Sequence, residues 1–193
     1  TYVNNGINMA ELQEIIDKTE KIEHPFTVYT LGRICHQKNP TLFNEIAESI
    51  PDVKFVWIGD GELREQLTSK NIEITGWTDR STAIRYAVNA DVFLLPSRWE
   101  GLPISLLESM YMKKVCLVSN VIGNRDVVHN DKNGFVCEMA KEFVEVIEKF
   151  RNKNFQADIK RITDQAYQDV LNMYNTKVMA EQYKIDYEKV IRE

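Results

Sequence analysis

The sequence predicts an α/β fold in which helices cover both faces of a parallel sheet. Predicted strands and helices alternate about five times along the 193 residues, and this alternation is typical of βαβ units. The central strand segments, such as Val92-Phe93-Leu94-Leu95, are apolar throughout, whereas a strand with one solvated face would alternate apolar and polar residues. A chain of this length forms one large domain, or a domain with a tail, around a sizeable core.

The predicted strands are short runs of β-branched, aromatic and aliphatic residues next to turn residues. The six runs are residues 26–31, 54–58, 72–75, 92–95, 115–118 and 135–137. Residues 2–8 add a strand-like piece, which the turn signal Asn5-Gly6 interrupts.

Apolar residues at helical spacing predict helices between these strands. Asn39-Pro40 is typical of an N-cap and first helical residue, and Asp79 or Ser81 is expected to cap a later helix. Asn175-Thr176 is expected to separate two C-terminal helices. The other helices are expected in residues 40–50, 62–68, 81–88, 103–111 and 140–150, with a weak helix or surface connector in 9–24.

The composition narrows the class of protein. A formal net charge of −5 argues against nonspecific binding of nucleic acid or anionic membranes by the whole surface. Cys35, Cys116 and Cys137 are an odd number of cysteines, two of them in apolar stretches, so we expect reduced core thiols in a cytosolic protein. The three histidines show no metal-ligand spacing, so no metal site is expected. No apolar run reaches the length of a membrane span, and no signal peptide is expected.

Polar residues recur where the predicted strands end, at Arg33, Gly59-Asp60-Gly61, Gly76-Trp77 and residues 97–101. Ligands of open α/β sheets bind at this carboxyl edge, so these positions predict a single site. Arg33 and Lys38 together suit the oxygens of a diphosphate, because arginine offers a planar fork and lysine a compact charge. The alternative is two ordinary solvated loop cations.

Two carboxylates, Glu100 and Glu108, lie eight positions apart across the strand-to-helix turn. They are either an acid/base pair of the kind that glycosidases use, acceptors for sugar or ribose hydroxyls, or ordinary surface and helix-face carboxylates. The last interpretation is weaker for Glu108, because a carboxylate on a largely apolar helix needs a partner. Backbone amides of Leu102 and Ile104 lie near the helix start and suit a phosphate. Gly101 lets a ligand approach the backbone.

Two further motifs border this predicted site. Gly59-Asp60-Gly61 begins like a dinucleotide fingerprint, but Arg64 occupies the third glycine position, so we expect a strand-to-helix turn instead. Trp77 would stack on a base or fill the sheet edge, and packing in the core or at the edge is the preferred interpretation of an isolated Trp.

These motifs together resemble the C-terminal, donor-binding half of the GT-B fold glycosyltransferases of the retaining group 1 class. The resemblance covers nearly the whole chain in the family's order, and the Glu-x7-Glu element combined with the Arg/Lys pair is its most specific part. The matching segments are Asn5-Gly6-Ile7, Leu31-Gly32-Arg33 with Lys38-Asn39, residues 57–61, Gly76-Trp77-Thr78, residues 90–97, Glu100 through Glu108, and Asn133-Gly134-Phe135.

The resemblance implies a Rossmann-like sheet and a division of the chain into three parts. Residues 1–24 are an inter-domain connector and the start of the domain, residues 25–157 are the nucleotide-sugar-binding domain, and residues 158–193 are helices that pack on it and towards a missing N-terminal acceptor domain. The chain opens at Thr1, so we expect a fragment that is inactive alone. One departure lies at Asp126, which stands in a segment where the family often has a glutamate.

The resemblance also implies roles for individual residues. Arg33 and Lys38 hold the diphosphate and stabilise the departing nucleoside diphosphate, and Glu100 contacts the transferred sugar, so these three are the implied catalytic residues. Glu108 accepts hydrogen bonds from ribose hydroxyls. The implied nucleotide-sugar site comprises Arg33, Lys38, Gly59, Trp77, Glu100, Gly101, Leu102, Ile104 and Glu108.

The implied function is transfer of a hexose-type sugar from a UDP- or GDP-linked donor to a glycan or lipid-linked acceptor, with retention and without a metal or other cofactor. The implied location is the cytoplasm, free or peripheral at the inner membrane face. A sugar-nucleotide epimerase of the same fold is disfavoured by the Glu-x7-Glu pattern. A non-catalytic α/β ligand-binding module, such as a receiver-like domain, would need an acidic cluster where Gly32-Arg33 stands. A glycoside hydrolase using Glu100 and Glu108 would leave Arg33 and Lys38 unexplained.

Overall fold

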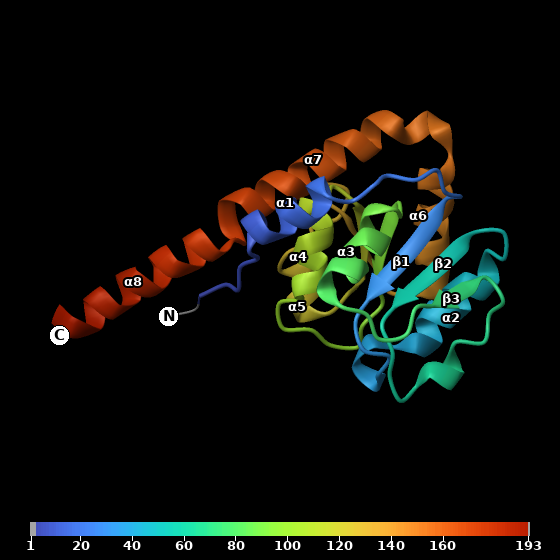
Figure 1. The fold of residues 1–193 in the computed structure, drawn as a ribbon, viewed down its shortest axis with the longest axis horizontal. Coiled ribbons are helices and arrows are strands. Elements are labelled where there is room, and N and C mark those ends of the chain that lie inside the picture. The colour runs from blue at the N-terminus through green and yellow to red at the C-terminus, as the bar shows by residue number, and fades with distance from the viewer. Residues whose placement is uncertain (1–2, 193) are drawn as a thin grey trace.

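A computed structural model describes residues 3–192 and contains an all-parallel six-stranded sheet (Figure 1). The strand order is β3-β2-β1-β4-β5-β6. The chain builds the sheet outwards from β1 in one direction and then continues from β4 in the other, so the switch point, where ligands of open α/β sheets bind, lies between β1 and β4. The strands are β1 Thr27–Leu31, β2 Lys54–Ile58, β3 Ile72–Ile74, β4 Val92–Leu95, β5 Val115–Ser119 and β6 Phe135–Cys137. The predicted parallel α/β fold is confirmed.

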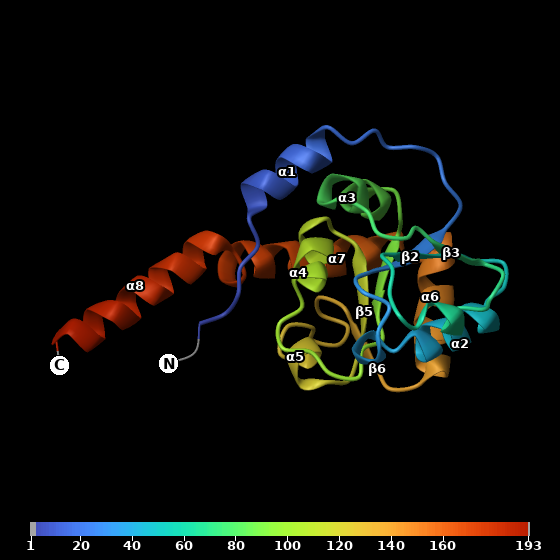
Figure 2. The same ribbon diagram turned by 60° about the horizontal axis from the view of Figure 1, so that its bottom comes forward.

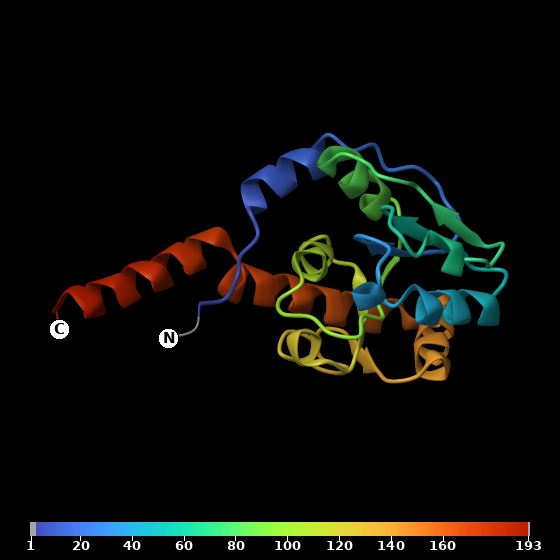
Figure 3. The same cartoon turned by 90° about the horizontal axis from the view of Figure 1, so that it is seen from below.

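Helices cover both faces of the sheet (Figure 2). The core consists of two apolar layers. Helices α2 and α6 pack on one face, whereas α1, α3, α4 and α7 cover the other. Helix α8 extends away from this body (Figure 3). The helices are α1 Met9–Asp17, α2 Pro40–Ser49, α3 Arg80–Val88, α4 Ile104–Tyr111, α5 Ile122–Arg125, α6 Ala140–Arg151, α7 Gln156–Met173 and α8 Thr176–Arg192, with short 3-10 turns η1 His36–Lys38, η2 Arg64–Gln66 and η3 Lys153–Phe155.

Alternation along the strands divides the core between these two layers. Val28 of β1 packs with the layer under α2 and α6, whereas its neighbour Tyr29 packs with the layer under α3 and α4. The Tyr29 hydroxyl lies 2.7 Å from Ser109 Oγ on α4, so its polar end is satisfied inside the core. Because successive strand residues point to opposite faces, a strand covered on both faces is apolar throughout, as the sequence predicted.

The N-terminal segment does not add a strand to the sheet. Ile7 forms only an isolated bridge with Asn175, in which Ile7 N donates to Tyr174 O at 3.0 Å. A Cβ on Gly6 would lie 2.3 Å from the carbonyl carbon of Asn175, so the chain crosses the α7–α8 junction at backbone contact distance. The strand-like interpretation of residues 3–8 was therefore wrong, and its first residue, Tyr2, lies outside the described residues.

Helix boundaries follow the predicted caps with three differences. Asp79 accepts a hydrogen bond from Thr82 N at 3.0 Å and caps α3 as expected. Helix α2 begins at Pro40, but Asn39 adopts a left-handed conformation (φ 54°) and its side chain does not cap the helix. The helix expected in residues 62–68 is reduced to the 3-10 turn η2, and helix α5 was not predicted.

Candidate functional site

The loops that follow β1 and β2 are in direct backbone contact at the carboxyl edge of the sheet. Gly59 has a φ of +141°, and a Cβ there would lie 2.2 Å from Gly32 O. A Cβ on Gly61 would lie 2.2 Å from Ile34 O. Only glycine permits such close approaches, so these glycines fix the loop that carries the predicted cations.

Lys38 and Glu100 form a largely buried ion pair at this edge. Lys38 Nζ lies 2.6 Å from Glu100 Oε1, and the two side chains are 17% and 5% exposed. Ser97 Oγ donates to the same carboxylate oxygen at 2.6 Å. The structure therefore brings together the lysine after β1 and the carboxylate after β4, across the switch point of the sheet.

Backbone contacts hold the two loops of this ion pair together. Arg98 N donates to Gln37 O at 2.8 Å, and Gln37 Nε2 donates to Trp99 O at 3.0 Å and to Glu100 Oε2 at 3.4 Å. The sequence analysis did not identify Gln37. Its only signal was its position next to Lys38, because the contacts come from the fold.

Helix α5 packs against the Glu100-Gly101 turn at a glycine, Gly123. A Cβ on Gly123 would lie 1.9 Å from Gly101 O and 2.5 Å from Glu100 O, so α5 and the turn meet backbone to backbone. In contrast, a Cβ on Gly101 would meet nothing within 4 Å. The outer side of this turn is therefore open to an approaching ligand.

The first turn of α4 follows this loop directly. Its N-cap is Pro103, whose side chain accepts no hydrogen bond, and Ile104 is 40% exposed. The first N–H groups of a helix have no partner within the helix and carry a partial positive charge. The amide of Ile104, which is expected to contact a phosphate, thus begins a helix without a side-chain cap. Leu102 and Gly101 come directly before this helix start.

Glu108 lies one turn further along α4 and is buried against α3. Arg80 Nη1 lies 2.6 Å from Glu108 Oε1, and the Glu108 side chain is 4% exposed. Arg80 Nε also donates to Glu11 Oε1 on α1 at 2.9 Å. Burial raises the pKa of Glu108, and the nearby Arg80 opposes this rise. The partner that a carboxylate on an apolar helix requires is therefore Arg80, which the sequence analysis did not identify.

Two further predicted side chains are exposed. The Arg33 side chain is 73% exposed, and its Nε lies 3.0 Å from Glu62 Oε2. Trp77 is 84% exposed, so its interpretation as a core or edge-packing residue was wrong. It follows Gly76, whose φ of +73° turns the chain at the end of β3, and the indole is left in solvent.

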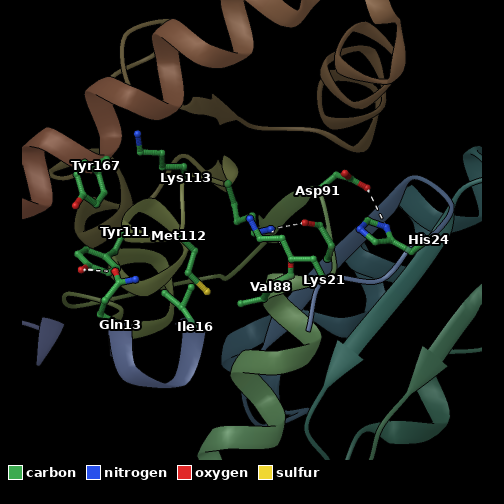
Figure 4. A pocket seen from close by; sticks show the side chains of 12 residues that line it. Gln13, Ile16, Lys21, His24, Val88, Asp91, Tyr111, Met112, Lys113 and Tyr167 are labelled. Atoms are coloured by element: carbon green, nitrogen blue, oxygen red, sulfur yellow. Dashed lines mark hydrogen bonds and ion pairs between the residues drawn. The ribbon is translucent and has the colours of Figure 1, made fainter. Parts of the chain in front are cut away.

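A cavity of about 420 Å³ lies at the opposite, amino edge of the sheet. Gln13 and Tyr111 form a hydrogen bond on one side of it, and His24 and Asp91 lie on the other (Figure 4). Lys114 donates to Val88 O at 2.8 Å and Ala90 O at 2.6 Å, which satisfies carbonyls at the end of α3. The cavity therefore contains none of the predicted site residues.

Neither a metal cluster nor a membrane helix is found in the described part of the chain. Among residues 3–192, no three His, Cys, Asp or Glu side chains are grouped so as to hold a metal ion. The helices of the same residues are too short or too polar to cross a membrane. Cys116 and Cys137 are buried, and burial raises the pKa of the Cys137 thiol to about 12.

The sequence matches a known protein family over most of its length. The model of the family "Glycosyl transferases group 1" matches residues 12–169. An Escherichia coli UDP-Gal:alpha-D-GlcNAc-diphosphoundecaprenol alpha-1,3-galactosyltransferase is 35% identical over 161 residues, which cover 72% of this chain and 41% of that protein. The putative teichuronic acid biosynthesis glycosyltransferase TuaC of Bacillus subtilis is 25% identical over 193 residues, which cover 93% and 49%. The chain thus spans less than half of each relative.

Solved structures share the fold at low sequence identity. Anabaena HepE in complex with UDP has a TM-score of 0.82 and 14% identity, covering 98% of this chain and 57% of that protein. The C-terminal domain of the group 1 family protein LpcC from Francisella tularensis has a TM-score of 0.67 and 18% identity, covering 90% of this chain and 97% of that domain. This likeness concerns the fold alone.

Proposed function

Because the chain belongs to the group 1 glycosyl transferases, we propose that the carboxyl edge of its sheet binds the nucleotide-diphosphate-sugar donor. The observation that carries this proposal is the buried cluster of Lys38, Glu100 and Ser97, located beside the start of α4. A cation and a helix N-terminus together suit a diphosphate. The Escherichia coli relative is named for UDP-Gal, and the Anabaena HepE structure is a complex with UDP, which supports a nucleotide ligand of this class.

The diphosphate lies between the cations and the first turn of α4. Lys38 and the amides around Gly101, Leu102 and Ile104 contact its oxygens, and Arg33 exchanges its exposed ion pair with Glu62 for the same ligand. Such an exchange is favourable, because an exposed ion pair contributes little, whereas arginine binds phosphate through a fork of two hydrogen bonds.

The remaining site residues contact the two ends of the donor. Glu100, held by Lys38 and Ser97, faces the transferred sugar, and Glu108 accepts hydrogen bonds from the ribose hydroxyls. Gly59 and Trp77 border the base. The 84% exposure of Trp77 leaves its ring available for stacking.

We infer that the whole protein transfers a hexose-type sugar with retention and without a metal ion. The bond between the anomeric carbon and the diphosphate oxygen breaks, a bond to an acceptor oxygen forms on the same face, and the acceptor hydroxyl gives its proton to the departing diphosphate. Lys38, Arg33 and the N-terminus of α4 offset the charge that develops on the diphosphate. The acceptor is a glycan or a lipid-linked glycan, as the undecaprenol named in a similar protein supports. The protein acts in the cytoplasm or at the inner membrane face.

The acceptor is proposed to bind outside this chain, on an N-terminal domain that precedes residues 1–24. The segment at Gly6 and Ile7, which crosses the α7–α8 junction, is the connector towards that domain. Under this proposal residues 25–157 bind the donor, residues 158–193 pack on them and reach the N-terminal domain, and the present chain alone transfers no sugar.

Calorimetric titration of the 193-residue chain with UDP, GDP and ADP tests the proposal. We expect one of them to bind, and Lys38→Ala to weaken its binding by about 10- to 100-fold, since a hydrogen bond to a charged group contributes about 1.5–3 kcal/mol. Arg33→Ala should weaken binding less, because its side chain is exposed. Lys54→Ala is the matched control, since Lys54 pairs with Glu73 at the amino end of β2. The proposal is contradicted if none of the three nucleotides binds, or if the affinity is unchanged by both Lys38→Ala and Arg33→Ala.

A further inference from the structure

Arg80 connects the predicted ribose carboxylate to the N-terminal connector. Its Nη1 contacts Glu108 on α4 at 2.6 Å, and its Nε contacts Glu11 on α1 at 2.9 Å. Glu11 is itself held by Asn8, whose Nδ2 donates to Glu11 Oε2 at 3.3 Å. Because two different nitrogens of one planar guanidinium are occupied, α1 and α4 together fix its orientation.

Glu108 retains acceptor capacity despite this ion pair. Its Oε1 lies 2.6 Å from Arg80 Nη1 and accepts no other hydrogen bond from residues 3–192. An ionised carboxylate offers two acceptor oxygens with about four lone-pair positions. Arg80 uses one of these positions, so a ligand hydroxyl delivered to Glu108 can take another.

We propose that Arg80 is a positioning residue, which orients the Glu108 carboxylate and keeps it charged so that it accepts hydrogen bonds from the ribose hydroxyls of a nucleoside diphosphate. The inference rests on the proposed donor-binding function of the carboxyl edge. Arg80 acts through Glu108, and its own position depends on Glu11 of the connector. The connector thereby contributes to nucleotide recognition without contacting the nucleotide.

The electrostatic surroundings of Glu108 support this role. The groups that face it are Arg80 from α3, Glu11 from α1 and the buried Tyr29 from β1. Burial raises the pKa of Glu108, Glu11 raises it further, and Arg80 is the group that lowers it. Without Arg80 the carboxyl group binds a proton at higher pH, and a protonated carboxyl has lost part of its capacity to accept.

The test compares two ligands that differ in a ribose hydroxyl. The tightest-binding of UDP, GDP and ADP, and its 2′-deoxy analogue, are titrated into the 193-residue chain and into Arg80→Met. We expect the unsubstituted chain to prefer the ribonucleotide by about 10-fold, the value of one hydrogen bond to a charged group. Arg80→Met should lose most of this preference, and its Kd for the ribonucleotide should rise more steeply than that of the unsubstituted chain as the pH is lowered.

Three further variants separate positioning from a merely structural role. Arg80→Lys keeps a cation and should restore part of the preference. Glu11→Gln leaves both Arg80 and Glu108 in place and should reduce the preference only partly, which keeps the test valid if Arg80→Met does not fold. Arg85→Met is the matched control, because Arg85 lies on the same helix and donates to Thr82 Oγ1 instead.

The outcomes separate this inference from the proposed function. If the unsubstituted chain binds none of the three nucleotides, the proposed function itself is overturned. If the chain binds a nucleotide but does not prefer the ribose form, the role of Glu108 and this inference are overturned while donor binding stands. The inference is also overturned if Arg80→Met and Glu11→Gln keep the preference, or weaken both ligands equally.

Discussion

Lys38 at the carboxyl edge of the sheet contacts the side chains of another loop, whereas Lys114 at the amino edge contacts backbone carbonyls. Lys38 lies 2.6 Å from Glu100, on the far side of the switch point. Lys114 donates to Val88 O and Ala90 O, where α3 ends. Both lysines are largely buried, but the first belongs to a cluster of side chains from two loops, and the second completes a helix end.

The cavity and the candidate site lie at different edges of the sheet. The cavity of about 420 Å³ lies at the amino edge. If Lys114 moved away there, the carbonyls at the end of α3 would lose the hydrogen bonds that it donates. The carboxyl edge has the glycine contacts at Gly59 and Gly123, the open side of Gly101 and the start of α4. The candidate site at the carboxyl edge is therefore marked by side-chain ion pairs and backbone access, and not by the volume of a cavity.

The strongest test of the carboxyl edge compares its two glycines, Gly123 and Gly101. Gly123→Ala should lower the free energy of unfolding by about 3 kcal/mol, the upper end for overpacking, because its Cβ would lie 1.9 Å from Gly101 O. Gly101→Ala should change it by less than about 0.5 kcal/mol, since the added methyl group meets open space. Urea denaturation measures both values, and equal stabilities would contradict the backbone contact between α5 and the turn.

The amino edge is tested by the pH dependence of stability. Burial lowers the pKa of Lys114 to about 8 from 10.5, so between these values the unfolded chain binds a proton that the folded chain does not. Stability therefore rises with pH in this window. We expect the unsubstituted chain to gain about 2 kcal/mol over Lys114→Met between pH about 7 and pH about 9.5.

Lys54→Met is the control for this titration, because the exposed Lys54 forms only a surface ion pair with Glu73. Its stability difference from the unsubstituted chain should stay constant over the same range. Chemical denaturation at several pH values gives both differences. A flat difference for Lys114→Met would show that Lys114 keeps its ordinary pKa, and that burial does not disfavour its charged form.

The strands were predictable because their signal is local. Runs such as residues 92–95 are apolar on both faces and stand next to turn residues, so the parallel sheet followed from them. The strand prediction for residues 3–8 failed because the partners of this segment are Tyr174 and Asn175, far along the chain. Helix α5 has only four residues, too few for a periodic pattern to emerge.

The candidate site was predictable only in part, for the same reason. Strand-end logic located Lys38 and Glu100, which the structure brings together. It identified Arg33 as the second cation of the site, and the turn η1 between the two residues leads their side chains to different carboxylates. Arg80 was missed although it begins the helix after β3, because its contact with Glu108 depends on how α3 packs beside α4.

Trp77 supplies the smallest and most selective test of the difference between the two edges. An isolated Trp in a sequence does not reveal whether its indole is packed or free, and the structure leaves this ring 84% exposed after β3. Trp77→Ala should therefore change the free energy of unfolding by less than about 0.5 kcal/mol. It should weaken nucleoside diphosphate binding by about 1–2 kcal/mol if the ring stacks on the base.

A matched aromatic at the amino edge completes this experiment. Tyr86 lies near the end of α3 and is 37% exposed, so Tyr86→Ala removes a ring on the opposite side of the sheet and should leave nucleotide affinity unchanged. Trp77→Phe should retain most of the affinity, because a smaller ring still stacks. Equal losses for Trp77→Ala and Tyr86→Ala in calorimetric titration would mean that neither ring contacts the base, and the base would then have to be bordered by the backbone around Gly59 alone.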